Sequence, residues 1–580
     1  MTLGTTNTGG RISPSPSSSV PAPVPDGTRP PPPTTATNTT GDDGGGDWKP
    51  TKRFLLAIAS LQVLIAAVAI ESTSLAPTLP IMSAELGGTA LQAFWAGTGY
   101  LLASTLIQPS VASMSHILGR RIMLYISGAG FAGGSLIAAL AGNFTLVLVG
   151  RIIQGIGGGG LVVVIEILIS DLIPLAHRGT WFSINSIMWS IGTAGGPLIG
   201  AGFAQNVSWR WIFWINLPIV GLGMVFVTLF LNQAPVPGHI VEKLLWFDWL
   251  GSVLFSISSA SVLFGITTGG VVFEWGSYQV LIPVIVGLAG IVCFFYWEIR
   301  FASNPIIEKR IFSTWTANAA YAQTLLHGLV TWAAFYFLVL YYQGVKSYSP
   351  IFSAVALLPE TINMAWASII IGVIAGKTMK YRWALWGGWS LVTLGAGLLY
   401  LLEPGTSVVQ WVFLNVPFGI GIGSLFTAEI LAIQASTAPM FNGHAAAFFS
   451  FIRIFGQAIG VAVSGVIFQN VFKQQLGRLP GFASVADEYS RDATIVVEVI
   501  RDMPEGTPKR QIIQAFSSSL QAVWLSLLAF SAVGLILSTT VKGYSMKQEH
   551  VTEQKLVEEE KSVVGILESG VMGSDRVETR

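Results

Sequence analysis

Apolar stretches long enough to cross a lipid bilayer fill most of the chain between Phe54 and Val541. We count fourteen of them, separated mostly by short polar runs. Crossing ~30 Å of hydrocarbon takes about 20 helical residues. Because hydrocarbon offers the backbone no hydrogen-bonding partner, such segments must be helices or strands of a closed barrel, and these runs lack the alternation of barrel strands. The sequence therefore predicts an all-α polytopic membrane protein.

Composition agrees with this prediction and argues against several functions. Charged residues make up 11% of the chain and hydrophobic residues 52%, whereas a typical soluble domain carries roughly 25% charged residues. The net charge of +1, with no basic cluster among aromatics, gives no support to a nucleic-acid partner. The single cysteine, Cys293, allows neither an intrachain disulfide nor a thiolate metal site.

No sequence motif indicates catalysis or nucleotide binding. The run from Gly155 to Gly160 matches the dinucleotide fingerprint literally, but it lies inside an apolar span with no strand before it. We find no Walker motif, no metal-ligand cluster and no nucleophile constellation. The sequence therefore predicts a protein that is not an enzyme, needs no cofactor or metal, and takes its energy from an ion gradient.

The basic residues fix the expected orientation of the spans. Lys and Arg gather in alternate short loops, so the positive-inside rule places both termini in the cytoplasm. We place the spans near residues 54–79, 91–112, 120–141, 145–169, 180–204, 211–231, 247–269, 278–298, 315–342, 351–375, 383–403, 409–434, 444–471 and 519–541.

The spans divide into two groups of six with a pair between them. The loops after the second and the tenth span, "MSHILGRRIML" and "GKTMKYRWALWGGW", are both basic turns between apolar helices, and structural repeats are common in secondary transporters. We predict a disordered cytoplasmic tail at 1–50, an N-terminal six-helix bundle at 54–231, an inserted helix pair at 247–298, a C-terminal six-helix bundle at 315–541 with an outer loop at 472–518, and a cytoplasmic tail at 542–580.

Several short motifs follow one another in order along these spans. They include "AIESTSLAPTLP" in the first span, "LGRR" after the second, "GRIIQGIGGGG" in the fourth, "GTAGGPLIG" in the fifth and "WRWIFWINLP" entering the sixth. Together they resemble the 14-span drug:proton antiporter family of the major facilitator superfamily, in particular its fungal efflux-pump branch. The resemblance implies a major facilitator fold with 14 transmembrane helices.

The resemblance also implies a function. It indicates a proton-coupled secondary transporter that exports an amphipathic organic compound, such as a toxin, drug or secondary metabolite, by alternating access. The expected partners are a small-molecule substrate, protons and the lipid bilayer, with no obligate protein partner. Two alternatives stay open: proton-coupled uptake of a siderophore or nutrient, and a non-transporting membrane sensor. The plasma membrane is the expected location, with the vacuolar membrane second.

Two motifs carry the gating roles that the resemblance implies. The antiport motif of the fifth span combines small residues, which let helices approach closely, with a proline, which permits a kink; it comprises Gly192, Gly196, Pro197 and Gly200. The motifs of the cytoplasmic turns comprise His116, Gly119, Arg120, Arg121, Asp171 and Arg178.

His116 departs from the family pattern, which usually has an Asp three residues before its Gly-Arg pair. A histidine, with an ordinary pKa of ~6.5, is mostly neutral at pH 7 and supplies no fixed negative charge. We therefore predict that Asp171, in the next cytoplasmic turn, supplies the missing carboxylate.

Charged side chains inside the spans are further candidates, because each costs about +2.5 to +3.5 kcal/mol to insert. At 1.5 Å per residue, Glu71 and Arg151 fall at similar depth. We predict that they meet and carry the proton coupling. Glu429 and Arg453 both fall in the inner halves of their helices; we predict that they form a structural charged pair, with a substrate role as the alternative.

Other polar residues of the spans receive plainer interpretations. We interpret Glu166 as mostly interfacial. His327 and Glu360 are further candidates in the ninth and tenth spans, but a lone polar group is more often a satisfied packing residue, and we interpret both in that way. Two sequons on the predicted outer side make Asn143 and Asn206 glycosylation candidates.

Overall fold

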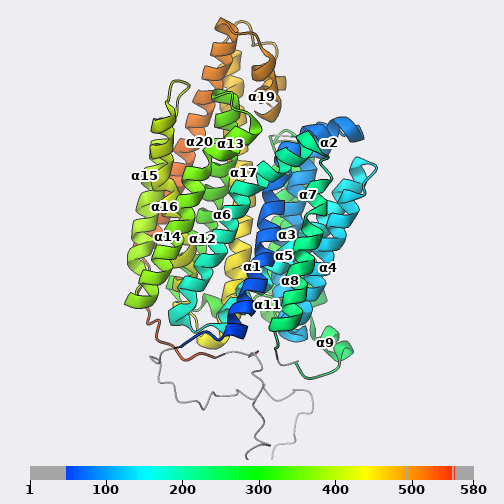
Figure 1. The fold of residues 1–580 in the computed structure, drawn as a ribbon, viewed down its shortest axis with the longest axis vertical. Helices are drawn as coiled ribbons and strands as arrows, with labels where there is room; N and C mark the ends of the chain where they lie inside the picture. The colour runs from blue at the N-terminus through cyan, green and yellow to red at the C-terminus, as the bar shows by residue number, and fades with distance from the viewer. Residues whose placement is uncertain (1–47, 234–235, 271, 491–492, 552–553, 555–580) are drawn as a thin grey trace, which may run out of the picture. The chain divides into compact units, whose positions relative to one another are not determined.

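The computed structural model of the protein describes residues 48–233, 236–270, 272–490, 493–551 and 554. These residues belong to one compact unit (Figure 1). Of the predicted tails, 1–47 and most of 542–580 lie outside the described residues.

Helices account for nearly all the secondary structure of the described residues, which also include an isolated β-bridge between Gly269 and Phe273. The predicted all-α fold class is confirmed. The long helices are α1 (Lys52–Ser74), α3 (Ala90–Leu118), α4 (Arg120–Ala139), α5 (Phe144–Leu172), α6 (Leu175–Asn206), α8 (Asn216–Phe230), α10 (Trp249–Thr268), α11 (Tyr278–Arg300), α12 (Trp315–Leu340), α14 (Leu358–Thr378), α15 (Arg382–Leu399), α16 (Val408–Ser436), α17 (Asn442–Gly477) and α20 (Thr507–Thr539).

Shorter helices lie between them. They are α2 (Leu79–Leu86), α7 (Trp211–Trp214), α9 (Ile240–Trp246), α13 (Pro350–Ala356), α18 (Ala486–Ser490) and α19 (Ala493–Asp502), with short 3₁₀ or π turns at Ala76–Thr78, Lys309–Phe312, Tyr341–Val345 (η3) and Pro439–Phe441. The predicted outer loop 472–518 is shorter in the structure, because α17 continues to Gly477 and α20 already begins at Thr507.

Twelve stretches of the described residues are long and apolar enough to cross a membrane. The two other predicted spans coincide with α6 and α15, helices of 32 and 18 residues. Helix α6 buries the polar side chains of Ser183, Asn185 and Ser186. Polar groups that face neighbouring helices do not meet lipid, so a less apolar helix can still span. The structure is compatible with fourteen spans, and that number stays a prediction.

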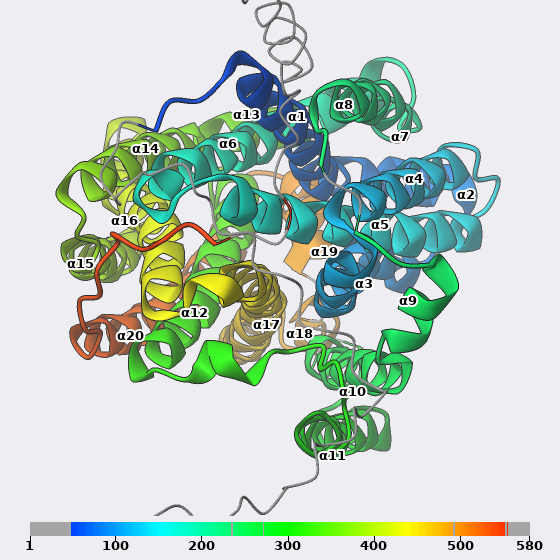
Figure 2. The same cartoon turned by 90° about the horizontal axis from the view of Figure 1, so that it is seen from below.

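The helices pack in sequence-local groups. Helix α1 packs along α6 and α8, and α5 packs along α3 and α4. Later in the chain, α16 packs along α14 and α15, and α12 packs along α17 and α20. Helices α10 and α11 pack on each other at one side, where α10 also contacts α3 and α17 (Figure 2). This packing agrees with two bundles and an inserted pair, a division that remains our prediction.

The segment after α20 crosses the ends of several helices (Figure 2). The Lys542 backbone N–H donates to the Thr316 hydroxyl at 3.0 Å, and the Gln548 amide donates to the Ala435 carbonyl at 2.8 Å. Further on, the Gln554 side chain accepts from the Arg120 backbone N–H at 3.1 Å. Residues 541–551 and 554 therefore join α12 and α16 to α4 on the predicted cytoplasmic side.

Both predicted sequons lie at helix ends. The Asn143 side chain caps α5 by accepting from the Leu146 backbone N–H at 2.8 Å, as expected for an asparagine N-cap. Asn206 is the last residue of α6, and its amide donates to the Gly202 carbonyl at 2.9 Å. Their glycosylation stays a prediction.

Candidate functional site

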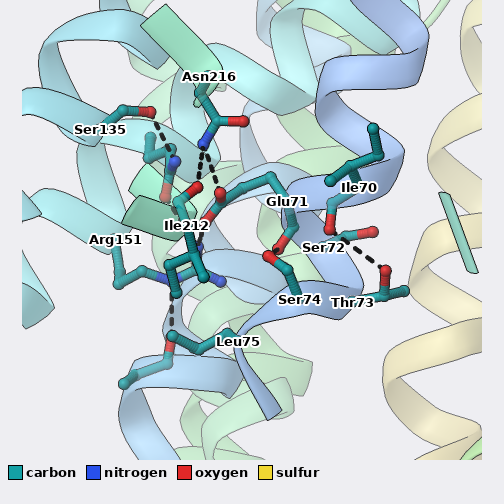
Figure 3. Close-up of polar contacts among 12 residues, drawn as sticks. Ile70, Glu71, Ser72, Thr73, Ser74, Leu75, Ser135, Arg151, Ile212 and Asn216 are labelled. Atoms are coloured by element: carbon teal, nitrogen blue, oxygen red, sulfur yellow. Dashed lines mark hydrogen bonds and ion pairs between the residues drawn. The ribbon is translucent and has the colours of Figure 1, made fainter. Parts of the chain in front are cut away.

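Glu71 and Arg151 form an ion pair buried between α1 and α5 (Figure 3). The side chains are 0% and 1% exposed, so water does not screen the pair. The second Glu71 carboxylate oxygen accepts from the Asn216 amide of α8. Two helices far apart in sequence thus hold one carboxylate through a cation and an amide.

The guanidinium of Arg151 makes three contacts besides the one with Glu71. Its Nε donates to the Ala96 carbonyl of α3 at 3.0 Å, and its Nη1 also donates to Gln154 at 2.7 Å. The ring of Tyr100 lies 4.3 Å from the guanidinium, close enough for a cation–π contact. Gln154 in turn donates to the Ser135 hydroxyl of α4 at 2.7 Å (Figure 3). The network around Glu71 and Arg151 therefore reaches five helices: α1, α3, α4, α5 and α8.

The antiport motif of α6 packs directly on the helix that carries Glu71. A Cβ on Gly192 would lie 2.4 Å from the Ala69 Cβ, and a Cβ on Gly196 would lie 2.0 Å from the Thr73 hydroxyl. The Thr73 hydroxyl donates to the Gly192 carbonyl at 2.8 Å. Gly200 approaches the Ser74 carbonyl as closely, and Pro197 lies inside the helix between them. These glycines let α1 and α6 touch backbone to backbone.

Arg120 is the centre of the predicted cytoplasmic gate. Its Nε donates to the Asp171 carboxylate at 3.0 Å, and its Nη1 donates to the Ser115 hydroxyl at 2.9 Å. The His116 ring lies 2.9 Å from Nη2 and stacks on the His444 ring of α17 with centroids 3.7 Å apart. Asp171 thus pairs with Arg120, and its carboxylate lies beside the turn in which His116 replaces the family's Asp.

Other residues of the gating motifs are placed differently. Gly119 joins α3 to α4 with a φ of +106°, which favours glycine. Arg121 points away from the gate, and its guanidinium donates to Tyr125 at 3.2 Å and to the Thr228 carbonyl at 3.1 Å. Arg178 donates to the Gln434 side chain of α16 at 3.1 Å. The structure therefore brings His116, Arg120 and Asp171 together, whereas the hydrogen bonds of Arg121 and Arg178 go to other residues.

The predicted pairing of Glu429 with Arg453 is wrong. Arg453 donates to Glu166 of α5 at 2.6 Å, and Glu429 contacts the His327 ring of α12 at 3.0 Å. Residue 453 of α17 faces α5, whereas residue 429 of α16 faces α12, so the two side chains diverge. Glu166 is 1% exposed, so its interpretation as interfacial is also wrong.

Contacts between the earlier and the later helices gather toward the predicted cytoplasmic side. Besides the Arg453–Glu166 pair, the Gln434 amide donates to the Ser170 hydroxyl at 2.6 Å. Helices α6 and α14 touch at Gly179 and Gly372, where a Cβ on Gly372 would lie 2.4 Å from the Gly179 carbonyl. We name these contacts the inner closure.

Sequence reasoning missed several residues of these sites. Asn216 lies in the "WRWIFWINLP" motif, where an amide in an apolar run was the available signal. Gln154 follows Arg151 by one helical turn, and Gln434 follows the "TAEIL" segment. Each is a lone amide inside a span, a position that is costly unless a partner is present.

One polar cluster lies near the opposite ends of the helices. Glu85 of α2 accepts from Arg210 at 2.5 Å and from the Trp209 indole at 2.7 Å. Hydrogen bonding from Arg210, then from Trp209, holds the pKa of the Glu85 carboxyl below its ordinary value of 4.5. The side chain is 46% exposed, so this cluster closes a loop at the surface rather than forming part of a buried site.

Long apolar helices with ion pairs buried between them define a multi-pass membrane protein. Residues 61–251 match the family model of the Major Facilitator Superfamily. "MFS transporter L2" of Phoma sp. is 45% identical over 514 residues, which cover 89% of this chain and 86% of that protein. "Efflux pump FUS6" of Gibberella moniliformis is 33% identical over 518 residues, which cover 88% of this chain and 92% of that protein.

Among solved structures, the human organic anion transporter MFSD10 (TETRAN) shares the fold with a TM-score of 0.52 at 14% identity, over 84% of this chain and 100% of that chain. The chain belongs to the major facilitator superfamily, in its fungal efflux-pump branch. This is a family of transporters of small molecules, not of enzymes.

Proposed function

We propose that the protein is a proton-coupled secondary transporter that exports an amphipathic organic compound across the plasma membrane by alternating access. The observation that carries the proposal is the buried Glu71–Arg151–Asn216 network. A carboxylate beside a guanidinium is attracted to it only while ionised, so binding of a proton weakens the tie between α1 and α5. Proton binding to Glu71 would thereby change the packing of α1 against α5.

Helix α5 offers a direct link from this network to the inner closure. It carries Arg151 near one end and Glu166 farther along, about 22 Å away at 1.5 Å per residue. Glu166 holds Arg453 of α17. A shift of α5 that follows protonation of Glu71 therefore acts on the contact that ties α5 to α17. This is the mechanical connection that alternating access requires.

Two features support an amphipathic substrate. A groove of about 480 Å³ between α1, α6 and α8 is lined by apolar side chains and one amide, Gln62. A second pocket, of about 10 Å³, is lined in part by Trp189 of α6, Trp332 of α12 and Gln457 of α17, where the two tryptophan rings meet edge to face at 6.4 Å; it would have to widen to hold an organic molecule. Mostly apolar walls with few polar groups suit small organic molecules.

Export rather than uptake is supported by two observations. The close α1–α6 contact is made by the motif that the family resemblance associates with antiport. A relative that covers nearly the whole chain is named an efflux pump.

Transport into inside-out membrane vesicles with an acidic interior tests the proposal. A panel of hydrophobic toxins and secondary metabolites should contain a compound that accumulates inside and leaks out when the pH gradient is dissipated. Glu71→Gln should abolish this accumulation while leaving substrate binding intact, and Glu85→Gln, which changes an exposed carboxylate, should not. Gradient-driven accumulation retained in Glu71→Gln would reduce the pair to a structural tie.

The same assay separates the alternatives. Accumulation in intact cells that is driven by an acidic medium would indicate uptake of a siderophore or nutrient. A signalling response in cells without flux of any compound would indicate a membrane sensor.

A further inference from the structure

Glu360, near the start of α14, is fully buried and differs from the other buried carboxylates of the predicted site. Its exposed fraction is 0%, and neither carboxyl oxygen has a hydrogen-bond partner in the described part of the chain. The carboxylates of Glu71, Glu166 and Glu429 each contact an arginine or a histidine. Its interpretation as a satisfied packing residue is therefore wrong.

The backbone fixes Glu360 in this position. Its N–H donates to the Leu357 carbonyl at 3.1 Å, so the helix start is already hydrogen-bonded, and no side-chain cap is present. On the facing helix, a Cβ on Gly419 would lie 2.5 Å from the Glu360 carbonyl. Helices α14 and α16 therefore touch at this residue, and the carboxyl side chain stays enclosed without a role as a helix cap.

The neighbours of Glu360 form an incompletely paired polar cluster. Tyr342 of η3 lies close enough to interact electrostatically with the carboxyl group. The Asn415 amide of α16 donates to the Tyr342 hydroxyl at 2.7 Å, and the Trp411 ring lies 5.1 Å from the Tyr342 ring. The Asn415 side-chain oxygen and the Trp411 indole N–H have no partner in the described residues. The cluster comprises Tyr342, Glu360, Trp411 and Asn415.

Among the residues that the structure describes, no charge near the cluster balances an ionised Glu360. Lys346, at the end of η3, donates instead to the carbonyl oxygens of Pro404, at 2.7 Å, and Thr406. Helix α13 has no titratable residue, and the His177 and Arg178 side chains of α6 lie at its other end. On α16, Glu429 lies about 21 Å beyond Asn415 at 1.5 Å per residue.

A buried carboxylate without a partner is neutralised by a proton rather than kept charged. We propose that Glu360 is a second proton-binding residue of the transporter, in the later half of the chain, which carries a proton in this conformation and releases it in a conformation in which water reaches the cluster. The inference rests on the proposed proton coupling. The two carboxyls differ in environment: Glu71 accepts hydrogen bonds from a cation and an amide, and Glu360 accepts none from the described residues. Such a difference lets one site hold a proton while the other is ionised.

Infrared difference spectroscopy of the purified, lipid-embedded protein tests the protonation state directly. A protonated buried carboxyl gives a carboxylic C=O stretching band at neutral pH that shifts in D₂O. Glu360→Gln should remove that band, and Glu360→Asp should shift it. Glu403→Gln, which changes an exposed carboxylate near the same helix ends, should leave it in place. Identical spectra for the wild type, Glu360→Gln and Glu360→Asp would overturn the proposal.

Proton counting separates this inference from the proposed function. The compound that accumulates in the vesicle assay is added to weakly buffered protein, and the released protons are counted. Glu360→Gln should release fewer protons than the wild type, and Glu360→Asp should release about as many. Wild-type vesicles in which no compound responds to a pH gradient would refute the proposed function, whatever the infrared band shows. If Glu360→Gln matches the wild type in both gradient-driven transport and proton release, the role of Glu360 is refuted and the proposed function is not.

Discussion

Glu166→Gln should open the inner closure. The Arg453–Glu166 pair has an N–O distance of 2.6 Å and side chains only 4% and 2% exposed. Because both side chains are buried, the free energy that applies is that of a buried ion pair and not the ~0–1 kcal/mol contributed by a surface pair. Breaking a buried pair by removing one partner costs about 3–5 kcal/mol, because the other charge is left uncompensated.

The low end of that range applies here, because glutamine keeps an acceptor oxygen for Arg453. A loss of ~3 kcal/mol corresponds to roughly a hundredfold shift in a conformational equilibrium. The shift takes this full value if the pair separates when the cytoplasmic side opens, as the proposed mechanism requires. Glu166→Gln/Arg453→Met leaves no unpaired charge from this pair, so the double variant should recover most of the closed population.

Electron–electron distance measurements between two spin labels provide the assay. Labels at Ile122→Cys of α4 and Lys377→Cys of α14 occupy exposed positions toward the inner ends of their helices, in a Cys293→Ser background. The longer-distance population should grow in Glu166→Gln and shrink again in the double variant. Unchanged distances in Glu166→Gln, or equal opening in both variants, would refute the reasoning.

Three further outcomes are expected. Asp171→Asn should impair export more than His116→Ala in vesicle transport, because Asp171 holds the gate arginine through an ion pair; the reverse order would make the histidine the gate residue. Gly196→Val should abolish transport and Gly195→Val should not, because a Cβ on Gly196 would collide with α1 and one on Gly195 would meet nothing within 4 Å. Equal losses of transport in the two variants would show that the α1–α6 contact has no such role. Glu85 has a depressed pKa, so its stabilising contribution is present above pH 4.5 and is lost as pH falls through the lower folded value. Thermal unfolding of Glu85→Gln should therefore depend less on acidic pH than that of the wild type, and an unchanged profile would count against the pairing.

The sequence was sufficient for features that depend only on position along the chain, such as helix length and depth in the membrane. Apolar length and the need to satisfy the backbone in hydrocarbon gave the helices, and their polar ends follow local capping rules, as Asn143 shows at α5. The depth of Glu71 and Arg151 follows from a constant rise per residue, and the structure places the two side chains in contact. Their role in proton coupling stays a proposal.

Only the tertiary structure decided which side chains face each other. Each residue turns a helix by about 100°, so residues at equal depth can point to different neighbours. That rotation is set by packing such as the contacts of Gly456 of α17 with α12 and of Gly419 of α16 with α14. The rotation of α17 directs Arg453 to Glu166 instead of Glu429. The same packing encloses Glu360 without a partner, because an acid's environment depends on the helices around it and not on its place in the chain.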